Sequence, residues 1–115
     1  MELVTTDLHG ANGELITLLT CSGDLDIDTS ESFKLGVIPL LTQGDQLVVV
    51  NMESVPFVDS TGISAMIACF KAAQAAGSHC RFVITTPKVL RTLATTGVDQ
   101  FLTICPSTDS ALNVI

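Results

Sequence analysis

Basic residues are scarce in this sequence, which has five lysines and arginines against twelve aspartates and glutamates and a formal net charge of −7. A nucleic-acid-binding protein of this size needs the opposite balance, because positive charge must meet the phosphate backbone. The composition therefore predicts no nucleic-acid partner. An acidic surface serves solubility, and it equally suits a protein partner that has a basic docking face.

Long hydrophobic runs are also missing. Apolar segments such as residues 47–50 are far shorter than the roughly 20 residues that cross a bilayer. Residues 1–7 lack the basic start and the apolar stretch of a secretory signal. We therefore expect a cytoplasmic protein with no membrane-spanning segment.

Charged residues make up only 15% of the chain, whereas apolar residues make up 47%. This balance excludes intrinsic disorder and is typical of a compact fold. A chain of 115 residues is long enough for one hydrophobic core and too short for two. We expect a single domain over residues 1–115.

Paired metal-binding motifs are absent as well. The four cysteines have no C-x-x-C spacing and the two histidines lie far apart in sequence, so neither a zinc site nor a cofactor is predicted. Each cysteine has apolar neighbours, which favours buried, reduced thiols. A regulatory disulfide between Cys69 and Cys105 stays open as an alternative, if the helix and the strand that carry them pack together.

Signatures of common catalytic sites are missing too. No serine lies in a G-x-S-x-G elbow, and neither G-x-x-x-x-G-K-[ST] nor G-x-G-x-x-G occurs. Residues 59–62, Asp-Ser-Thr-Gly, are similar to an aspartic-protease loop, but an extra residue separates the aspartate from the glycine, and those enzymes need two such carboxylates. We therefore expect no enzyme, and we interpret Ser60 as a substrate rather than a nucleophile.

Strand and helix patterns alternate along the chain. Strands are expected at residues 1–9, 15–21, 47–50, 81–85 and 101–104, and helices at residues 28–41, 63–76, 87–96 and 107–112. Two strands in succession around the turn-rich residues 10–13 indicate an N-terminal β-hairpin. The remaining alternation predicts an α/β fold with a central, mixed but mostly parallel sheet of about five strands and about four helices.

The first expected helix has conflicting signals. Asp28 and Glu31 have the spacing of a capping box, which places the start of the helix at Asp28. Gly36 weakens the helix, and Pro39 removes a backbone donor. We therefore predict an irregular or shortened helix.

The rest of the chain is organised around residues 48–70. An unbroken apolar run predicts a strand that is buried on both faces, and a bend then leads into an amphipathic helix. Asp59, Ser60 and Thr61 stand at the helix start, where a hydroxyl could carry a phosphate beside free N–H groups, and Gly62 leaves room for close approach. Asp59 or Ser60 could equally serve only as the helix cap. Asp26 also follows a strand, so we expect it at the same end of the sheet.

Three segments carry a resemblance to a known family. They are residues 23–26 (Gly-Asp-Leu-Asp), 47–52 (Leu-Val-Val-Val-Asn-Met) and 57–63 (Phe-Val-Asp-Ser-Thr-Gly-Ile). In this order they resemble the Gly-Glu-Leu-Asp turn, the central strand and the phosphorylation loop of the STAS domain, specifically of bacterial anti-sigma factor antagonists. The sequence departs from the family at Asp24, at Ser64, where glycine is common, and in the helix with Gly36 and Pro39.

The resemblance implies a partner switch that regulates transcription. The unphosphorylated protein would bind an anti-sigma factor that is also a serine kinase, and phosphorylation would separate them until a serine phosphatase reverses it. The resemblance assigns the phosphoacceptor to Ser60, with Thr61 as the next candidate. It assigns Asp26, Asn51 and Asp59 to shaping the loop, with Gly62 and Ser64 beside it. The oligomeric state it implies is a monomer or a weak dimer.

Two other classes of function remain open. The chain could be a STAS scaffold or a regulatory subunit of a stress-signalling or transport complex, modulated through its cysteines. It could also be a small-ligand or nucleotide-binding domain that uses the helix start at Ser60 as an anion site.

Overall fold

The computed structural model describes residues 1–10 and 13–112 and contains one five-stranded sheet. The strands are β1 (Glu2–His9), β2 (Leu15–Ser22), β3 (Leu47–Ser54), β4 (His79–Val83) and β5 (Thr103–Cys105), and they lie side by side in this order. β1 runs antiparallel to β2, and every other neighbouring pair is parallel. The predicted α/β fold with a mixed, mostly parallel sheet and an N-terminal hairpin is confirmed.

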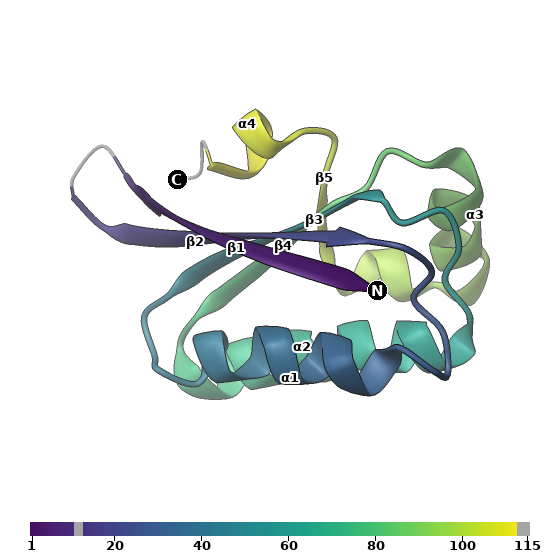
Figure 1. Cartoon of the computed structure of the whole chain (residues 1–115), viewed down its shortest axis with the longest axis horizontal. Coiled ribbons are helices and arrows are strands. Elements are labelled where there is room, and N and C mark those ends of the chain that lie inside the picture. The colour runs from purple at the N-terminus through teal and green to yellow at the C-terminus, as the bar shows by residue number, and fades with distance from the viewer. Residues whose placement is uncertain (11–12, 113–115) are drawn as a thin grey trace.

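The helices cover the two faces of the sheet unequally (Figure 1). They are α1 (Ser30–Leu41), α2 (Ser60–Ala76), α3 (Pro87–Thr96) and α4 (Thr108–Leu112), and a short 3₁₀ helix, η1 (Val98–Gln100), follows α3. α1 and α2 lie together under one face, whereas α4 lies over the other (Figure 1). Most of the sheet's buried side chains therefore point toward α1 and α2.

The apolar run in β3 is buried on both faces, as predicted. Val48 and Val50 belong to the large core beneath α1 and α2, whereas Val49 belongs to a small cluster beneath α4. All three side chains have no exposed surface. A strand that is covered on both sides has no polar alternation, which explains the sequence pattern.

The start of α1 differs from the prediction. The helix begins at Ser30 and its N-cap residue is Thr29, which makes no side-chain capping hydrogen bond. Glu31 does not reach back to the helix start but pairs with Lys34 at 3.2 Å. The predicted capping box at Asp28 and Glu31 is therefore wrong, because Asp26 already accepts the N–H groups of Asp28 and Thr29.

α1 ends at Leu41 as expected, but it is not shortened at Pro39, because the helix continues through that residue. A proline removes a single backbone hydrogen bond. Burial of Phe33, Val37 and Leu41 on one side holds the helix against the sheet in spite of this loss. Gly36 lies beneath β1, where a Cβ atom would come within 2.7 Å of Leu3 Cδ1.

The later elements agree with their predicted start and stop signals. α2 ends at Gly77 and α3 ends at Gly97, both of which adopt left-handed backbone angles. Pro87 is the first residue of α3, where its missing donor costs nothing. β5 begins at Thr103, two residues later than predicted, because residues 98–100 form η1.

Candidate functional site

The loops that follow β2 and β3 lie side by side at one end of the sheet. Leu25 and Val58 form an isolated parallel bridge between these loops. Leu25 N–H donates to the Phe57 carbonyl at 2.9 Å, and Asp59 N–H donates to the Leu25 carbonyl at 3.2 Å. The bridge brings the turn that carries Asp26 next to the loop that carries Ser60, as the sequence predicted.

Asp59 fixes the start of α2 and joins it to the neighbouring loop. One carboxylate oxygen, Oδ1, accepts the Gly62 N–H at 2.8 Å and caps the helix. The other, Oδ2, accepts the Ile27 N–H at 3.2 Å, across 32 residues of sequence. The predicted capping role of Asp59 is confirmed, and the link to Ile27 is an additional role that only the fold reveals.

Asp26 organises the turn into α1 in a similar way. Its Oδ1 accepts the Asp28 N–H at 3.0 Å and the Thr29 N–H at 3.2 Å. Thr29 Oγ1 accepts the Asp26 N–H at 2.9 Å and lies 2.8 Å from the Asp24 carbonyl, to which it donates. Asp26 therefore shapes its own loop, and the Leu25 bridge transmits that shape to the Ser60 loop.

Three hydroxyl groups lie in the first turns of α2. Ser60 is the first residue of the helix and is exposed, whereas Thr61 is half-buried. Ser64 is exposed one turn later, and its hydroxyl donates to the Ser60 carbonyl at 3.1 Å. The Ser60 side chain thus stands at the positive end of the helix, where a phosphate could be added without melting it.

Gly62 allows α2 to approach the bridge closely. A Cβ atom at this position would lie 2.4 Å from the Leu25 carbonyl oxygen and 3.0 Å from Val58 Cγ1. These are main-chain and buried core contacts that cannot rotate away. The glycine is therefore required by the distance between the helix and the adjacent loop.

Apolar side chains flank the site within an acidic surface. Ile27 is 72% exposed and Phe57 is 38% exposed, and they lie on the two loops that meet at the bridge. Lys88 of α3 lies over the Phe57 ring at 5.4 Å from its centroid. Ile27 and Phe57 were not singled out from the sequence, although an isoleucine between two aspartates in a turn is a visible signal of an exposed apolar contact.

Asn51 lies within β3, before the Ser60 loop, and its role in shaping that loop stays a prediction. It pairs with Val83 across β3 and β4, and its neighbours Val50 and Met52 both point into the core beneath α1 and α2. Because side chains alternate along a strand, Asn51 points to the α4 face. Its Oδ1 accepts the Glu53 N–H at 3.0 Å, so its hydrogen bond shapes the end of β3.

The cysteines do not form the disulfide that the sequence left open. All four are free thiols. Cys69 belongs to the core beneath α1 and α2, whereas Cys105 packs against the small cluster beneath α4, so the sheet separates the two residues. The proposed redox pair of Cys69 and Cys105 is therefore ruled out by the packing.

Burial makes three of the thiols poor nucleophiles. It raises the pKa of Cys21 and of Cys69 to about 12 each, and it raises the pKa of Cys80 well above its usual value. Their reactive thiolate forms are therefore negligible at neutral pH. Cys105, by contrast, is only partly buried.

We expect native protein treated with iodoacetamide near pH 8 to gain one adduct, at Cys105. Unfolded protein should gain four, because unfolding restores normal pKa values and access. Intact-mass measurement followed by peptide mapping checks this result. Rapid native labelling of Cys69 would contradict the core assignment.

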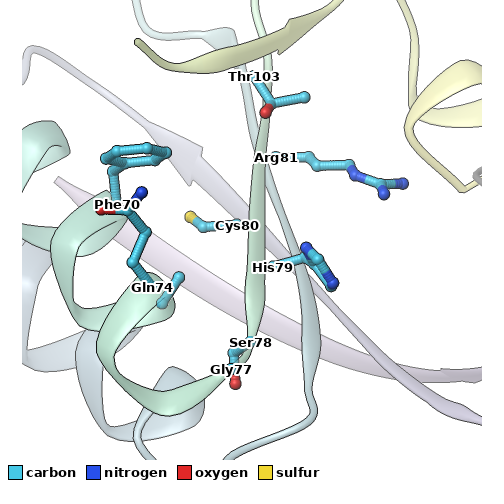
Figure 2. Close-up of a pocket in the computed structure, with 9 residues that line it drawn as sticks. Phe70, Gln74, Gly77, Ser78, His79, Cys80, Arg81 and Thr103 are labelled. Atoms are coloured by element: carbon cyan, nitrogen blue, oxygen red, sulfur yellow. The ribbon is translucent and has the colours of Figure 1, made fainter.

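A cavity of about 530 Å³ lies at the other end of α2 from Ser60, beside Gly77 and Ser78. Figure 2 shows that its lining side chains diverge: Gln74 and Cys80 lie on one side of β4, while Arg81 points to the other. Arg81 Nη1 already donates to the Ala111 carbonyl at 2.9 Å. The polar groups do not converge on one point, so this cavity offers little to orient a small ligand.

The fold and the loop geometry agree with a comparison against protein families, in which the model of the STAS domain matches residues 8–111. The chain belongs to the STAS domain family. The match includes the loop at Ser60, the Leu25 bridge and all of the sheet except part of β1. In the part of this STAS domain that the structure describes, no helix is both long and apolar enough to cross a membrane.

Solved structures with the same fold include both anti-sigma factor antagonists and a domain of an anion transporter. An anti-sigma factor antagonist from Mycobacterium paratuberculosis is 19% identical, with a TM-score of 0.78 and coverage of 96% of this chain and 92% of that one. The anti-sigma factor antagonist SpoIIAA in its unphosphorylated form is 15% identical, with a TM-score of 0.66 and coverage of 95% and 92%. A murine Solute Carrier 26 family anion transporter is 25% identical, with a TM-score of 0.73, and the match covers 84% of this STAS domain and 17% of the transporter.

Proposed function

We propose that this STAS domain is an anti-sigma factor antagonist that acts by partner switching in the cytoplasm. The observation that carries the proposal is the exposed Ser60 at the first residue of α2, on a loop whose sequence resembles the STAS phosphorylation loop. The unphosphorylated chain binds an anti-sigma factor with serine kinase activity and releases the sigma factor. The chain itself catalyses nothing and is the substrate of that kinase.

The acidic surroundings of Ser60 support phosphorylation as the off signal. Phosphorylation adds about −1.5 to −2 charges at pH 7. The group would stand beside the Asp59 carboxylate and near the turn that carries Asp26 and Asp28. Burying that charge against a partner requires desolvation and meets repulsion, whereas the helix start tolerates it in the free protein. The complex therefore separates without any rearrangement of the fold.

The partner face follows from the same residues. Ile27 and Phe57 provide exposed apolar contacts, and the net charge of −7 favours a partner with basic groups around its docking site. A serine phosphatase restores the binding form. The existence of SpoIIAA in phosphorylated and unphosphorylated forms, both with this fold, is consistent with such a cycle here.

Incubation with the cognate kinase and Mg-ATP tests the acceptor residue. We expect the wild-type protein and Thr61→Ala to gain one phosphate by intact mass, because both keep the exposed hydroxyl of Ser60. Ser60→Ala should gain none and should still bind the anti-sigma factor. Full phosphate uptake by Ser60→Ala would overturn the assignment of Ser60, and uptake that is lost only in Thr61→Ala would transfer it to Thr61.

The match to the anion transporter favours one alternative, a regulatory or scaffold subunit of a transport or stress-signalling complex. In that case the chain would co-purify from its host with a transporter or a large assembly. No kinase would be needed, and Ser60→Ala would leave the association unchanged. Recovery of an anti-sigma factor that dissociates on addition of Mg-ATP would instead support the partner switch.

A further inference from the structure

β1 is an edge strand that carries no partner on its outer side among the described residues. It pairs with β2 over all eight of its residues, from Glu2 with Ser22 to His9 with Leu15, and the register has no bulge. Figure 1 shows it as the outermost strand, in purple, next to β2. An edge of this length presents a row of free backbone groups that another strand can join.

A hydrogen bond at the hairpin end shows which backbone groups of β1 point away from β2. The Gly10 N–H donates to the Glu14 carbonyl at 2.8 Å, so these two residues form a hydrogen-bonded pair. Hydrogen-bonded and non-hydrogen-bonded pairs alternate along an antiparallel ladder. The even-numbered residues of β1 therefore bond to β2, and the odd-numbered residues direct their N–H and C=O groups outward. The outward residues are Leu3, Thr5, Asp7 and His9.

β1 lacks most of the features that usually protect an edge, although it carries the charged residues Glu2 and Asp7. Natural edges are kept apart by lysine, proline, bulges or shortness. β1 contains no lysine, arginine or proline, and its centre, Val4-Thr5-Thr6, is made of β-branched residues that favour strand pairing. Val4 is 55% exposed. The strand is thus open to pairing along its whole length.

We propose that two copies of this chain associate through β1, antiparallel and centred on Thr6, to form one continuous sheet. The two-fold axis is perpendicular to the sheet. Equivalent faces of the two copies therefore lie on the same side of the combined sheet. This register pairs the outward residue Leu3 with His9 of the second copy, and Thr5 with Asp7 of the second copy. Each of these pairs can exchange two backbone hydrogen bonds.

The side chains favour this register over its neighbours. It places the exposed Val4 opposite Leu8 of the second copy and Thr6 opposite its own equivalent, so apolar meets apolar and hydroxyl meets hydroxyl. A register centred on Thr5 would set Leu3 opposite an aspartate and Glu2 opposite a leucine. A register centred on Asp7 would place two carboxylates directly against each other.

The association is expected to be weak, because one strand pair buries less than a standard interface. We expect a monomer–dimer equilibrium with a Kd on the order of 100 µM, because interfaces below about 1,200 Å² belong to weak, transient encounters. The joint lies on β1 rather than at Ser60, so the proposal does not rest on the partner switch.

Sedimentation velocity over concentrations from about ten-fold below to about ten-fold above that Kd tests the dimer. We expect Thr6→Lys to weaken it at least about ten-fold, because two like charges would face each other at the axis. Thr5→Pro should do the same by removing an outward donor while the bonds to β2 remain. Thr95→Lys is the matched control, since it adds the same charge at an exposed position on α3.

Cross-linking tests the register. With Thr6→Cys the two introduced thiols would meet across a non-hydrogen-bonded pair, where Cα atoms are about 4.5 Å apart and a disulfide can form. With Thr5→Cys the two thiols lie on residues offset along the strands, with Cα atoms more than about 7 Å apart, so cross-linking should be slow. Peptide mapping identifies the bond that forms.

Several results would overturn the proposal. The first is that the wild-type protein stays monomeric at the highest concentration. The second is that Thr6→Lys and Thr95→Lys change the Kd of the dimer equally. The third is that Thr5→Cys forms cross-links faster than Thr6→Cys. Thermal melting followed by circular dichroism establishes that each variant is folded before its association is judged.

Discussion

Ser60→Asp is expected to bind the anti-sigma factor about 1,000-fold more weakly than the wild-type protein does. A loss of this size corresponds to about 4 kcal/mol, which is within the cost of a single badly placed charge in a protein interface. The added carboxylate would stand next to Asp59, whose own carboxylate is already engaged with Gly62 and Ile27. Titration calorimetry with the purified anti-sigma factor measures the change.

Ser60→Asn is the matched control, because asparagine has nearly the same shape as aspartate and no charge. It should retain most of the affinity if charge, rather than size, separates the partners. The stability of Ser60→Asp should not fall, since a negative charge in the first turn of a helix is favourable by about 0.3–1 kcal/mol. Equal losses in both variants would contradict the electrostatic account of the switch.

Gly62→Ala is expected to destabilise the domain by about 2–4 kcal/mol, because the new methyl group would overlap the Leu25 carbonyl. The Cβ atom would lie 2.4 Å from that oxygen, which already accepts the Asp59 N–H. Relief of the overlap must move the main chain and weaken the bridge between Leu25 and Val58. Thermal unfolding should show a fall in Tm of at least about 8 °C.

Gly36→Ala provides the comparison for this variant. Both glycines lie in helices, so each replacement gains about 0.5–1 kcal/mol of helix propensity. At Gly36, however, the new Cβ atom meets the end of the Leu3 side chain, which can rotate away. We expect a change within about 1 kcal/mol in either direction. Equal destabilisation of the two variants would show that the Leu25 carbonyl is not the cause.

The parts of the fold that the sequence predicted are those with local signals. The apolar run in β3, the glycines after α2 and α3, and the proline at the start of α3 each indicate a structure through their own backbone chemistry. The loop at Ser60 was found in the same way, because Asp59, Ser60 and Thr61 are residue types that favour a helix start. Such signals act over a few residues and need no knowledge of the rest of the chain.

The errors at α1 arose where local signals competed. Asp28 and Glu31 have capping spacing, but Asp26 already accepts the Asp28 N–H, which a capping box would need, through a turn that the Leu25 bridge supports. Pro39 was expected to bend or end the helix, but burial of the opposite side outweighed the loss of one hydrogen bond. Both outcomes depend on contacts between segments that are distant in sequence.

Local patterns in the amino-acid sequence were enough to predict the order of the elements, the α/β class and an accessible serine at the start of the second long helix. The packing of the whole chain was needed to place Asn51 and Cys105 on the α4 face and Cys69 on the other face, and to show that β1 is an open edge. The reason is that a strand buried on both sides, or only three residues long, shows no alternation to mark its faces. Side-chain direction is then set by the strand register, in which a shift of one residue exchanges the two faces.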